Sequence, residues 1–309
     1  MLVTDDMLAD LNIPHTFDEP LADKTWFKIG GHAKIYAQPE NEQQLSALVK
    51  RCKEQNVKTF VLGSGANLLV ADTGVDGVVI KLDADGFKQF AVNENMITVG
   101  AGYDLMKLVR KSAKLGLSGL QNVAGIPATV GGAIRMNAGG AFGDIGTAVK
   151  RVELMDSDGE IYYRDKSDLQ FNYRSTNISA RFILEVDFEL EPDDCEDLTK
   201  EIHRIFTYKS STQPLAANSA GCTFKNPIDP QSKTFGKTGD IIPAGKLIDD
   251  AGLKGFHVGG AAVSEHHANF IECNQDCTAT DVIQLIKHVQ KEVAEKFGIE
   301  LEREVVIWG

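Results

Sequence analysis

A glycine-rich stretch at residues 125–143, GIPATVGGAIRMNAGGAFG, constrains this chain more than any other segment. Its six glycines and Pro127 make it a poor α-helix and a poor β-strand. It is also too apolar for a disordered linker. Glycine lets the main chain approach a ligand without intervening side chains. We therefore expect a tightly packed loop that cradles a large cofactor, with a purely structural loop as the alternative.

Two other motifs carry glycine beside polar side chains: GSGAN at 63–67 and GCTFKNP at 221–227. The apolar, extended segment LLVAD follows GSGAN, so no helix N-terminus is expected to meet a pyrophosphate there. Successive backbone N–H groups in GSGAN can still bind phosphate; the alternative is an ordinary turn between strands. GCTFKNP places a thiol, a lysine and an asparagine within five residues of a glycine. Together the motifs predict a nucleotide cofactor and a reactive side chain that faces a second ligand.

Length and composition are typical of a globular protein of about two domains. The chain has 309 residues, of which 43% are hydrophobic and 25% charged. A net charge of −12 argues against a nucleic-acid partner, which requires a basic surface. No apolar stretch is long enough to span a membrane, and the acidic N-terminal segment is unlike a signal peptide.

The cysteines indicate a reducing compartment. There are five, scattered along the chain, and no CxxC pair occurs. This pattern favours free thiols in the cytoplasm over a disulfide framework. Cys273 and Cys277 have no nearby His or Cys companion, so we expect no metal site.

Periodicity predicts mixed α and β structure in the first 190 residues. Residues 42–55 predict an amphipathic helix with one apolar face, formed by Leu45, Leu48, Val49 and Cys52. With strands at 57–62 and 77–82, this helix makes the first 80 residues resemble a βαβ unit. Asp156 to Gly159 predicts a hairpin turn. A helix at 103–115, with Leu105, Leu108 and Val109, interrupts the strands of this half, which we expect at 96–99, 149–155, 161–164 and 182–190.

The C-terminal third begins after a polar break at 191–195. A helix at 196–209 is expected, with one side formed by Leu198, Ile202, Ile205 and Phe206. A short helix at 246–251 follows. Thr278 and Asp281 form a capping-box pair that starts the last long helix, and Gly298 ends it. The terminal segment 301–308 is extended, with Glu302, Glu304 and Val306 opposite Val305.

Three single residues stand out for chemistry: Arg174 in NYRS, Cys222 and Glu304. Taken singly, each residue is better explained by a structural role than by a catalytic one. Arg174 can be a surface arginine, Cys222 a small buried thiol and Glu304 a solvated strand residue. Their importance depends on the resemblance that follows.

Eight motifs of the chain closely resemble, in the same order, those of the UDP-N-acetylenolpyruvoylglucosamine reductase (UDP-N-acetylmuramate dehydrogenase) family, over nearly the whole chain. They are TWFKIGG (25–31), VLGSGANLLV (61–70), GLSGLQNVAGIPATVGGAIRMNAGGAFG (116–143), FNYRST (171–176), GCTFKNP (221–227), AGKLIDDAGLKG (244–255), HHANFIECN (266–274) and LEREV (301–305).

The resemblance implies an α+β fold with a two-lobed FAD-binding module of the vanillyl-alcohol-oxidase-like type. That module would span 1–193, with lobes at about 1–80 and 81–193. A C-terminal α+β substrate domain would span 194–309, and its last strand would return to the active site. No histidine lies in the first glycine turn, so non-covalent FAD is expected. The residues that would contact FAD are Gly63, Ser64, Gly65, Ala66, Asn67, Leu68, Gly125, Ile126, Pro127, Thr129, Gly131, Gly132, Ala133 and Asn137.

The implied reaction is NADPH-dependent reduction of UDP-N-acetylglucosamine enolpyruvate to UDP-N-acetylmuramate in peptidoglycan precursor synthesis. It would serve cell-wall biogenesis, cell shape and cell division. NADPH would reduce FAD, and the flavin would then reduce the vinyl carbon of the substrate. Arg174 and Glu304 would stabilise charge on the substrate carboxylate. Cys222 would donate the final proton in place of the family's usual serine, with Ser219 and Thr223 as alternatives.

The resemblance also implies a substrate site formed by Lys225, Asn226, Lys209, Gln213 and His267. The chain lacks room for the family's extra tyrosine-bearing loop, which places it in the shorter class. The sequence leaves the oligomeric state open, with a monomer favoured. Two other functions stay open: another FAD oxidoreductase, such as an alcohol oxidase, and a non-catalytic nucleotide-sugar binder.

Overall fold

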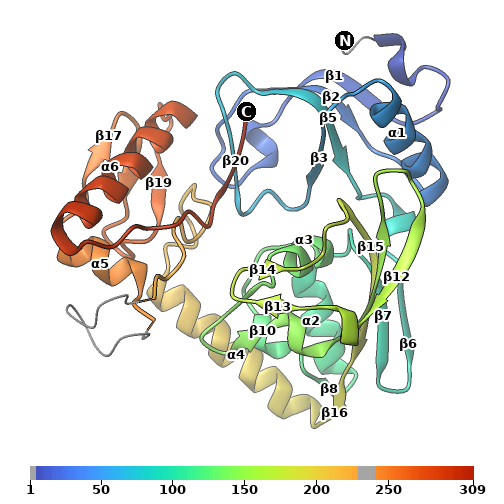
Figure 1. Ribbon diagram of the computed structural model, residues 1–309. Helices are drawn as coiled ribbons and strands as arrows, with labels where there is room; N and C mark the ends of the chain where they lie inside the picture. Colours follow the sequence, from blue (N-terminus) through green and yellow to red (C-terminus); the bar gives the residue numbers. More distant parts are fainter. Residues whose placement is uncertain (1–4, 229–240) are drawn as a thin grey trace. The chain divides into compact units, whose positions relative to one another are not determined.

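The computed structural model describes residues 5–228 and 241–309, which divide into two compact units (Figure 1). The first unit contains the chain up to residue 19 together with 33–64 and 76–209. The second unit contains 20–32, 65–75 and 210–309. Each unit is therefore assembled from three separate stretches of the chain.

The first lobe of unit 1 is a four-stranded sheet with the order β1-β2-β5-β3. Its helix α1 (Glu42–Glu54) begins where the Asn41 side chain accepts a hydrogen bond from the Gln44 backbone N–H, at 2.9 Å. The predicted apolar face of α1 is buried. The predicted βαβ unit is not formed by these elements: β3 and β5 pair in parallel, but α1 precedes both, and the segment 63–74 that joins them contains β4 and no helix. The strands are β1 (His15–Pro20), β2 (His32–Ala37), β3 (Thr59–Leu62) and β5 (Val75–Lys81).

The second lobe of unit 1 is an antiparallel sheet of five strands with the order β12-β11-β15-β7-β6. The predicted turn at 156–159 joins β11 to β12, as expected. Helix α2 (Leu105–Lys114) buries the predicted Leu105, Leu108 and Val109 in the core of this lobe. The strands are β6 (Phe90–Asn93), β7 (Met96–Gly100), β11 (Val149–Met155), β12 (Ile161–Asp165) and β15 (Phe182–Glu189).

The glycine-rich stretch contains a helix, so the prediction of a loop throughout was wrong there. Helix α3 (Val130–Arg135) starts at Thr129, whose Oγ1 accepts the Gly132 backbone N–H at 3.3 Å. A Cβ on Gly131 would lie 2.8 Å from the Cβ of Ala101. Glycine thus permits close packing of the helix, and burial of the neighbouring Val130, Ala133 and Ile134 offsets the low helix propensity of two glycines.

Short two-stranded ribbons complete unit 1. One of them, β13 (Phe171–Asn172) with β14 (Ser175–Thr176), forms a hairpin whose turn is Tyr173 and Arg174. The others pair β9 (Gly139–Gly140) with β10 (Gly143–Asp144) and β8 (Leu117–Ser118) with β16 (Glu191–Pro192).

Helix α4 (Cys195–Thr212) shows where the structural division differs from the boundary expected after residue 193. Residues up to Lys209 group with unit 1, because Ile205 belongs to the core of the second lobe. The helix begins where the Asp194 side chain accepts the backbone N–H groups of Glu196 and Asp197. Phe206, which was predicted to share one side of the helix with Leu198, Ile202 and Ile205, is 45% exposed.

Unit 2 packs two helices with short strands around its own core. The strands form the antiparallel sheet β17-β18-β19, and β20 pairs in parallel with β4. Phe27, Ile29 and Leu69, from the first quarter of the chain, are buried in the same core as the C-terminal residues. The elements are β4 (Leu68–Val70), α5 (Ala244–Asp250), β17 (His257–Val258), β18 (Ala261–Val263), β19 (Ile271–Cys273), α6 (Ala279–Phe297) and β20 (Val306–Trp308).

The ends of α6 are those predicted. Thr278 and Asp281 form the capping box, and Gly298 ends the helix with a left-handed φ of 68°. The predicted terminal strand is shorter than expected, because only 306–308 pair with another strand, β4. Val305 is buried while Glu302 and Val306 are exposed, in agreement with the predicted faces.

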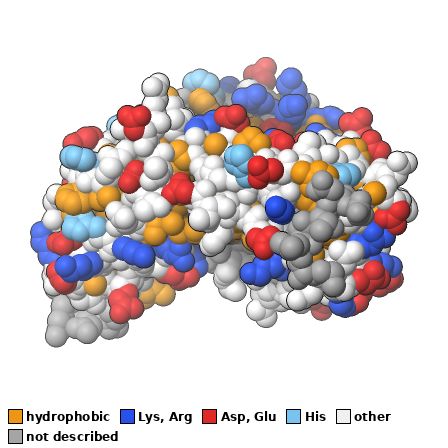
Figure 2. Space-filling view, turned by 90° about the horizontal axis from the view of Figure 1, so that it is seen from above, with side chains coloured by type: hydrophobic (Ala, Val, Ile, Leu, Met, Phe, Trp, Pro, Cys, Tyr) orange, Lys and Arg blue, Asp and Glu red, His pale blue; other side chains and the backbone are white. Residues whose placement is uncertain are grey.

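Acidic and basic side chains are interspersed over the face of the molecule seen in Figure 2. Within the described ranges, no helix is long and apolar enough to cross a membrane.

Candidate active site

Two of the predicted cofactor motifs lie against each other in unit 1. The hydroxyl of Ser64 donates a hydrogen bond to the Pro127 carbonyl oxygen at 3.0 Å. On the other side of the turn, the ammonium of Lys81 donates to the carbonyl oxygen of Gly63. Residues 63–64, which follow β3, are thus fixed beside 127–129, which precede α3.

The glycines here fall into two groups, which allows a test of whether the site fits a large cofactor. Gly125 has a left-handed φ of 75°, a backbone conformation that favours glycine, and a Cβ there would also lie 3.0 Å from Lys209 Cδ. At Gly63 and Gly132 φ is not left-handed, and a Cβ would have only one neighbour within 4 Å, the Thr129 hydroxyl, at 3.1 and 3.3 Å. Both contacts are tight but involve one side-chain hydroxyl and no backbone atom, so the protein constrains these two positions less than Gly125, whose left-handed φ itself favours glycine. A cofactor that is held by contacts with the protein backbone needs exposed main chain without side chains, and such main chain surrounds Thr129 Oγ1.

Lys209 and Arg174 lie near one another in unit 1. Lys209 is 8% exposed, and its ammonium donates a hydrogen bond to the Ala124 carbonyl oxygen at 2.6 Å. Burial, together with the positive charge of Arg174, lowers the pKa of Lys209 to about 8. Arg174 has a left-handed φ of 53° and stacks on the ring of Tyr173, with its guanidinium carbon 5.0 Å from the ring centroid.

Cys222 and Glu304 come together in unit 2, although 82 positions of sequence separate them. The Glu304 backbone N–H donates to the Thr223 carbonyl oxygen at 2.8 Å, and Phe224 forms a bridge with Arg303. On the other side, Cys222 forms a bridge with Phe270. The segment with the thiol therefore lies between 269–270 and 302–305.

Asn67, from the first quarter of the chain, is hydrogen-bonded to the segment that contains Glu304. Its amide donates to the Glu304 carbonyl oxygen at 3.1 Å, and its own carbonyl oxygen accepts the Val306 backbone N–H at 3.1 Å. Gly65, two residues earlier, has a φ of 70°, and a Cβ there would overlap the Lys24 carbonyl oxygen. Packing inside unit 2 thus explains the glycine at 65, in contrast to Gly63.

The remaining predicted substrate residues of unit 2 have protein partners. Lys225 forms an ion pair of 2.6 Å with Glu302, and Asn226 Oδ1 accepts the Ala244 backbone N–H at 2.9 Å, at the start of α5. His267 Nδ1 accepts the Asn269 backbone N–H at 3.3 Å, and burial lowers the pKa of this histidine. Gln213, which precedes Pro214, is partly exposed.

Sequence reasoning missed Asn269. This side chain is 2% exposed, donates to the Phe224 carbonyl oxygen at 2.8 Å and accepts the Phe224 backbone N–H at 2.9 Å. It therefore fixes the backbone two residues beyond Cys222. The only signal for Asn269 in the sequence is that this polar residue lies between two apolar neighbours, Ala268 and Phe270. That signal does not point to a functional site, because a buried asparagine must be hydrogen-bonded wherever it lies in a protein.

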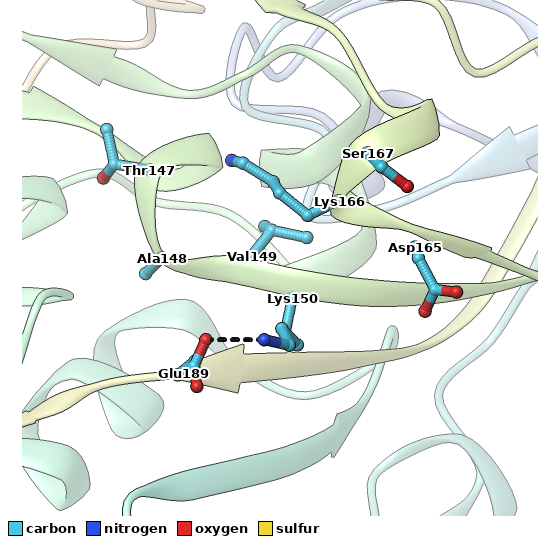
Figure 3. Close-up of a pocket in the computed structure, with 8 residues that line it drawn as sticks. All are labelled: Thr147, Ala148, Val149, Lys150, Asp165, Lys166, Ser167 and Glu189. Atoms are coloured by element: carbon cyan, nitrogen blue, oxygen red, sulfur yellow. Dashed lines mark hydrogen bonds and ion pairs between the residues drawn. The ribbon is translucent and has the colours of Figure 1, made fainter.

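A cavity of about 380 Å³ lies elsewhere in unit 1 (Figure 3). Its lining includes Lys150 and Glu189, which form an ion pair of 2.9 Å, but none of the residues predicted to be functional. Within 5–228 and 241–309, no group of three or more His, Cys, Asp or Glu side chains is placed to bind a metal ion.

Comparison with known proteins defines the class first. A model described as FAD binding domain matches residues 33–163, which include the glycine motifs at 63–67 and 125–143. The chain therefore carries an FAD-binding domain, and the bare backbone beside Thr129 fits that cofactor. A second model, UDP-N-acetylenolpyruvoylglucosamine reductase, C-terminal domain, matches residues 213–308.

Full-length relatives give the family. A protein of Desulfosudis oleivorans named UDP-N-acetylenolpyruvoylglucosamine reductase is 41% identical over 307 residues, which cover 95% of this chain and 94% of that protein. A Bacillus subtilis protein of the same name is 37% identical and covers 94% and 93%. The crystal structure of the Thermus caldophilus reductase matches with a TM-score of 0.78 and 32% identity, over 96% of this chain and 99% of that one. The chain belongs to the UDP-N-acetylenolpyruvoylglucosamine reductase family, and the predicted family, fold class and FAD cofactor are confirmed.

Proposed function

We propose that this chain reduces the enolpyruvyl ether of UDP-N-acetylglucosamine to UDP-N-acetylmuramate, with NADPH as donor and non-covalent FAD. Family membership supports the reaction. The observation that carries the assignment of residues is the direct backbone contact between the Cys222 and Glu304 segments, through Glu304 N–H and the Thr223 carbonyl oxygen at 2.8 Å.

When bound, FAD supplies the relay of two electrons from NADPH to the substrate. As the terminal vinyl carbon gains a hydride, the carbon next to the carboxylate becomes enolate-like and negative charge grows on the carboxylate. Arg174 stabilises that charge. Glu304 takes part by sharing a proton or bridging through another group, since two neighbouring carboxylates cannot both ionise without cost.

Cys222 donates the proton that completes the product. The S–H bond breaks, the new C–H bond forms at the carbon next to the carboxylate, and water later restores the thiol. A thiol suits this step because its reference pKa, about 8.5, is far below that of an alcohol. The two alternatives suit it less: Ser219 and Thr223 are 5% and 2% exposed, whereas Cys222 is partly exposed.

The other predicted contacts complete the proposal. Lys225, Asn226, Gln213 and His267 bind the UDP-sugar, and Lys209 contacts substrate beside the Gly125 turn. The backbone of 63–68 and 125–137 binds FAD. Five free thiols support a cytoplasmic location.

An anaerobic titration tests the proposed function. Purified protein is expected to be yellow, to bleach with NADPH, and to recover its colour when UDP-N-acetylglucosamine enolpyruvate is added. Controls receive UDP-N-acetylglucosamine, which lacks the enol ether. Protein that bleaches but recovers only with oxygen would contradict the proposal and indicate another FAD oxidoreductase. Protein that binds the substrate without any redox change would indicate a nucleotide-sugar binder.

A further inference from the structure

Asn137 is a predicted cofactor residue whose side chain is fully used within the protein. It is 3% exposed and lies two residues beyond the end of α3. Its Nδ2 donates to the Asn172 carbonyl oxygen at 3.0 Å, and its Oδ1 accepts the Gly146 backbone N–H at 3.1 Å. Both ends of the amide therefore bind backbone from other parts of unit 1.

The first of these bonds reaches the hairpin that presents Arg174. Asn172 is the last residue of β13 and pairs with Ser175 of β14, so Tyr173 and Arg174 form the turn. Arg174 has a φ of 53°, a left-handed conformation that is costly for a side chain with a Cβ. Such a conformation persists only where the surroundings impose it, typically at functional sites.

The second bond reaches the support beneath the same hairpin. A Cβ on Gly146 would overlap the ring of Phe171, so this ring packs directly on the Gly146 backbone. Lys166 donates to the Gly146 carbonyl oxygen and lies over the Phe171 ring, with its ammonium 4.8 Å from the centroid. Figure 3 shows its side chain extending toward the turn at Thr147. Asn137 and Lys166 thus fix the N–H and the C=O of one glycine on which the hairpin rests.

We propose that Asn137 is a positioning residue, which fixes the Arg174 hairpin relative to helix α3 of the FAD-binding lobe. This inference rests on the proposed function, because it assigns Asn137 to the step that Arg174 assists. Its amide supports the hairpin of the arginine that acts on substrate. Its backbone N–H already donates to the Ile134 carbonyl oxygen at 3.1 Å, so its contact with the cofactor would be through the backbone carbonyl.

Two substitutions separate this role from general stability. Asn137→Gly removes the amide and relieves the left-handed φ of 41°. Asn137→Asp keeps the shape and the acceptor, but its carboxylate cannot donate to the Asn172 carbonyl oxygen. Asn56→Gly is the matched control: Asn56 also follows a helix with a left-handed φ, of 54°, and is exposed.

The holoenzymes are compared by stopped flow. Both Asn137 variants are expected to be reduced by NADPH within about twofold of wild type. Their reoxidation by UDP-N-acetylglucosamine enolpyruvate should slow by about 10²-fold, the order expected when a reacting group is misplaced by 1 Å. In an Arg174→Ala background, Asn137→Gly should add little further slowing, because its effect acts through that arginine. Asn56→Gly should change neither half-reaction.

Hydrogen exchange of the flavin-free protein gives a second measurement that does not depend on turnover. Exchange of peptides that cover 171–176 should rise about tenfold or more in Asn137→Gly and stay unchanged in Asn56→Gly. Equal slowing of both half-reactions, full additivity with Arg174→Ala, or unchanged exchange would overturn the positioning role. Failure of the wild type itself to reoxidise with substrate would instead overturn the proposed function and, with it, this inference.

Discussion

At the scale of single residues, Cys222 lies where the family resemblance implies a serine. Asn269 fixes the Phe224 backbone by two hydrogen bonds, so we expect residue 222 to lie in the same place whether it is Cys or Ser. Both can donate a proton from the same place. We therefore expect the substitution to change how readily the proton is donated more than where the donor lies.

Replacing Cys222, the proposed proton donor, should affect one half-reaction only. Cys222→Ala is expected to slow reoxidation by substrate by about 10² or more, the usual contribution of a positioned general acid, while NADPH still reduces the flavin. Cys222→Ser should stay active. Stopped-flow traces that show both halves slowed alike would refute the role, and Thr223→Val and Ser219→Ala test the two alternatives.

Thiol alkylation provides an independent check of the same role. Cys52, Cys273 and Cys277 are buried, but Cys195 at the start of α4 is exposed and will also react. The experiment therefore uses a Cys195→Ser background. Alkylation should inactivate that protein and spare Cys195→Ser/Cys222→Ser; inactivation of both would identify another cysteine as the sensitive one.

At the scale of elements, the N-terminus of α6 depends on a residue distant in sequence. The Asp72 carboxylate accepts the backbone N–H groups of Ala279 and Thr280 at 2.8 and 2.9 Å, and the Thr280 hydroxyl at 2.6 Å. Burial raises the pKa of Asp72, but these hydrogen bonds, led by that of the Thr280 hydroxyl, outweigh burial and leave the pKa lowered. A negative charge is also favourable at a helix N-terminus.

Asp72→Ala should lower the free energy of unfolding by about 1–2 kcal/mol at neutral pH, the size of a helix-capping effect. Because the folded pKa lies below the unfolded one, this stabilisation is fully present above about pH 4 and is lost as the pH falls through the folded pKa. Urea unfolding at several pH values measures it. Asp76→Ala removes a nearby exposed carboxylate as the control; an equal loss in both variants, or a difference that persists in acid, would contradict the assignment.

At the scale of the whole molecule, unit 2 includes residues from the first quarter of the chain. Phe27, Ile29 and Leu69 are buried in its core, and β20 pairs with β4. Each such side chain contributes roughly 1.5–3 kcal/mol on burial, and a domain is stable by only about 5–15 kcal/mol in total. We therefore expect that the C-terminal hundred residues cannot fold stably without these N-terminal segments.

A fragment of residues 210–309 is expected to lack a cooperative thermal transition, whereas the intact chain should unfold cooperatively. Circular dichroism during heating, together with binding of a hydrophobic dye at 25 °C, measures both. A fragment that melts cooperatively and binds no dye would show that the N-terminal segments are dispensable for this core.

Sequence alone determined the features that depend on neighbours a few residues away. The apolar face of α1, the hairpin at 156–159 and the capping box and Gly298 of α6 follow from such local preferences, and the motif order identified the family. Tertiary structure decided the rest. It made a helix of the glycine-rich segment by burying Val130 and Ile134, and it drew 20–32 and 65–75 into unit 2. It also turned the Asn137 amide toward two distant backbones. These outcomes depend on contacts between segments far apart in the chain, whose energies no local pattern contains.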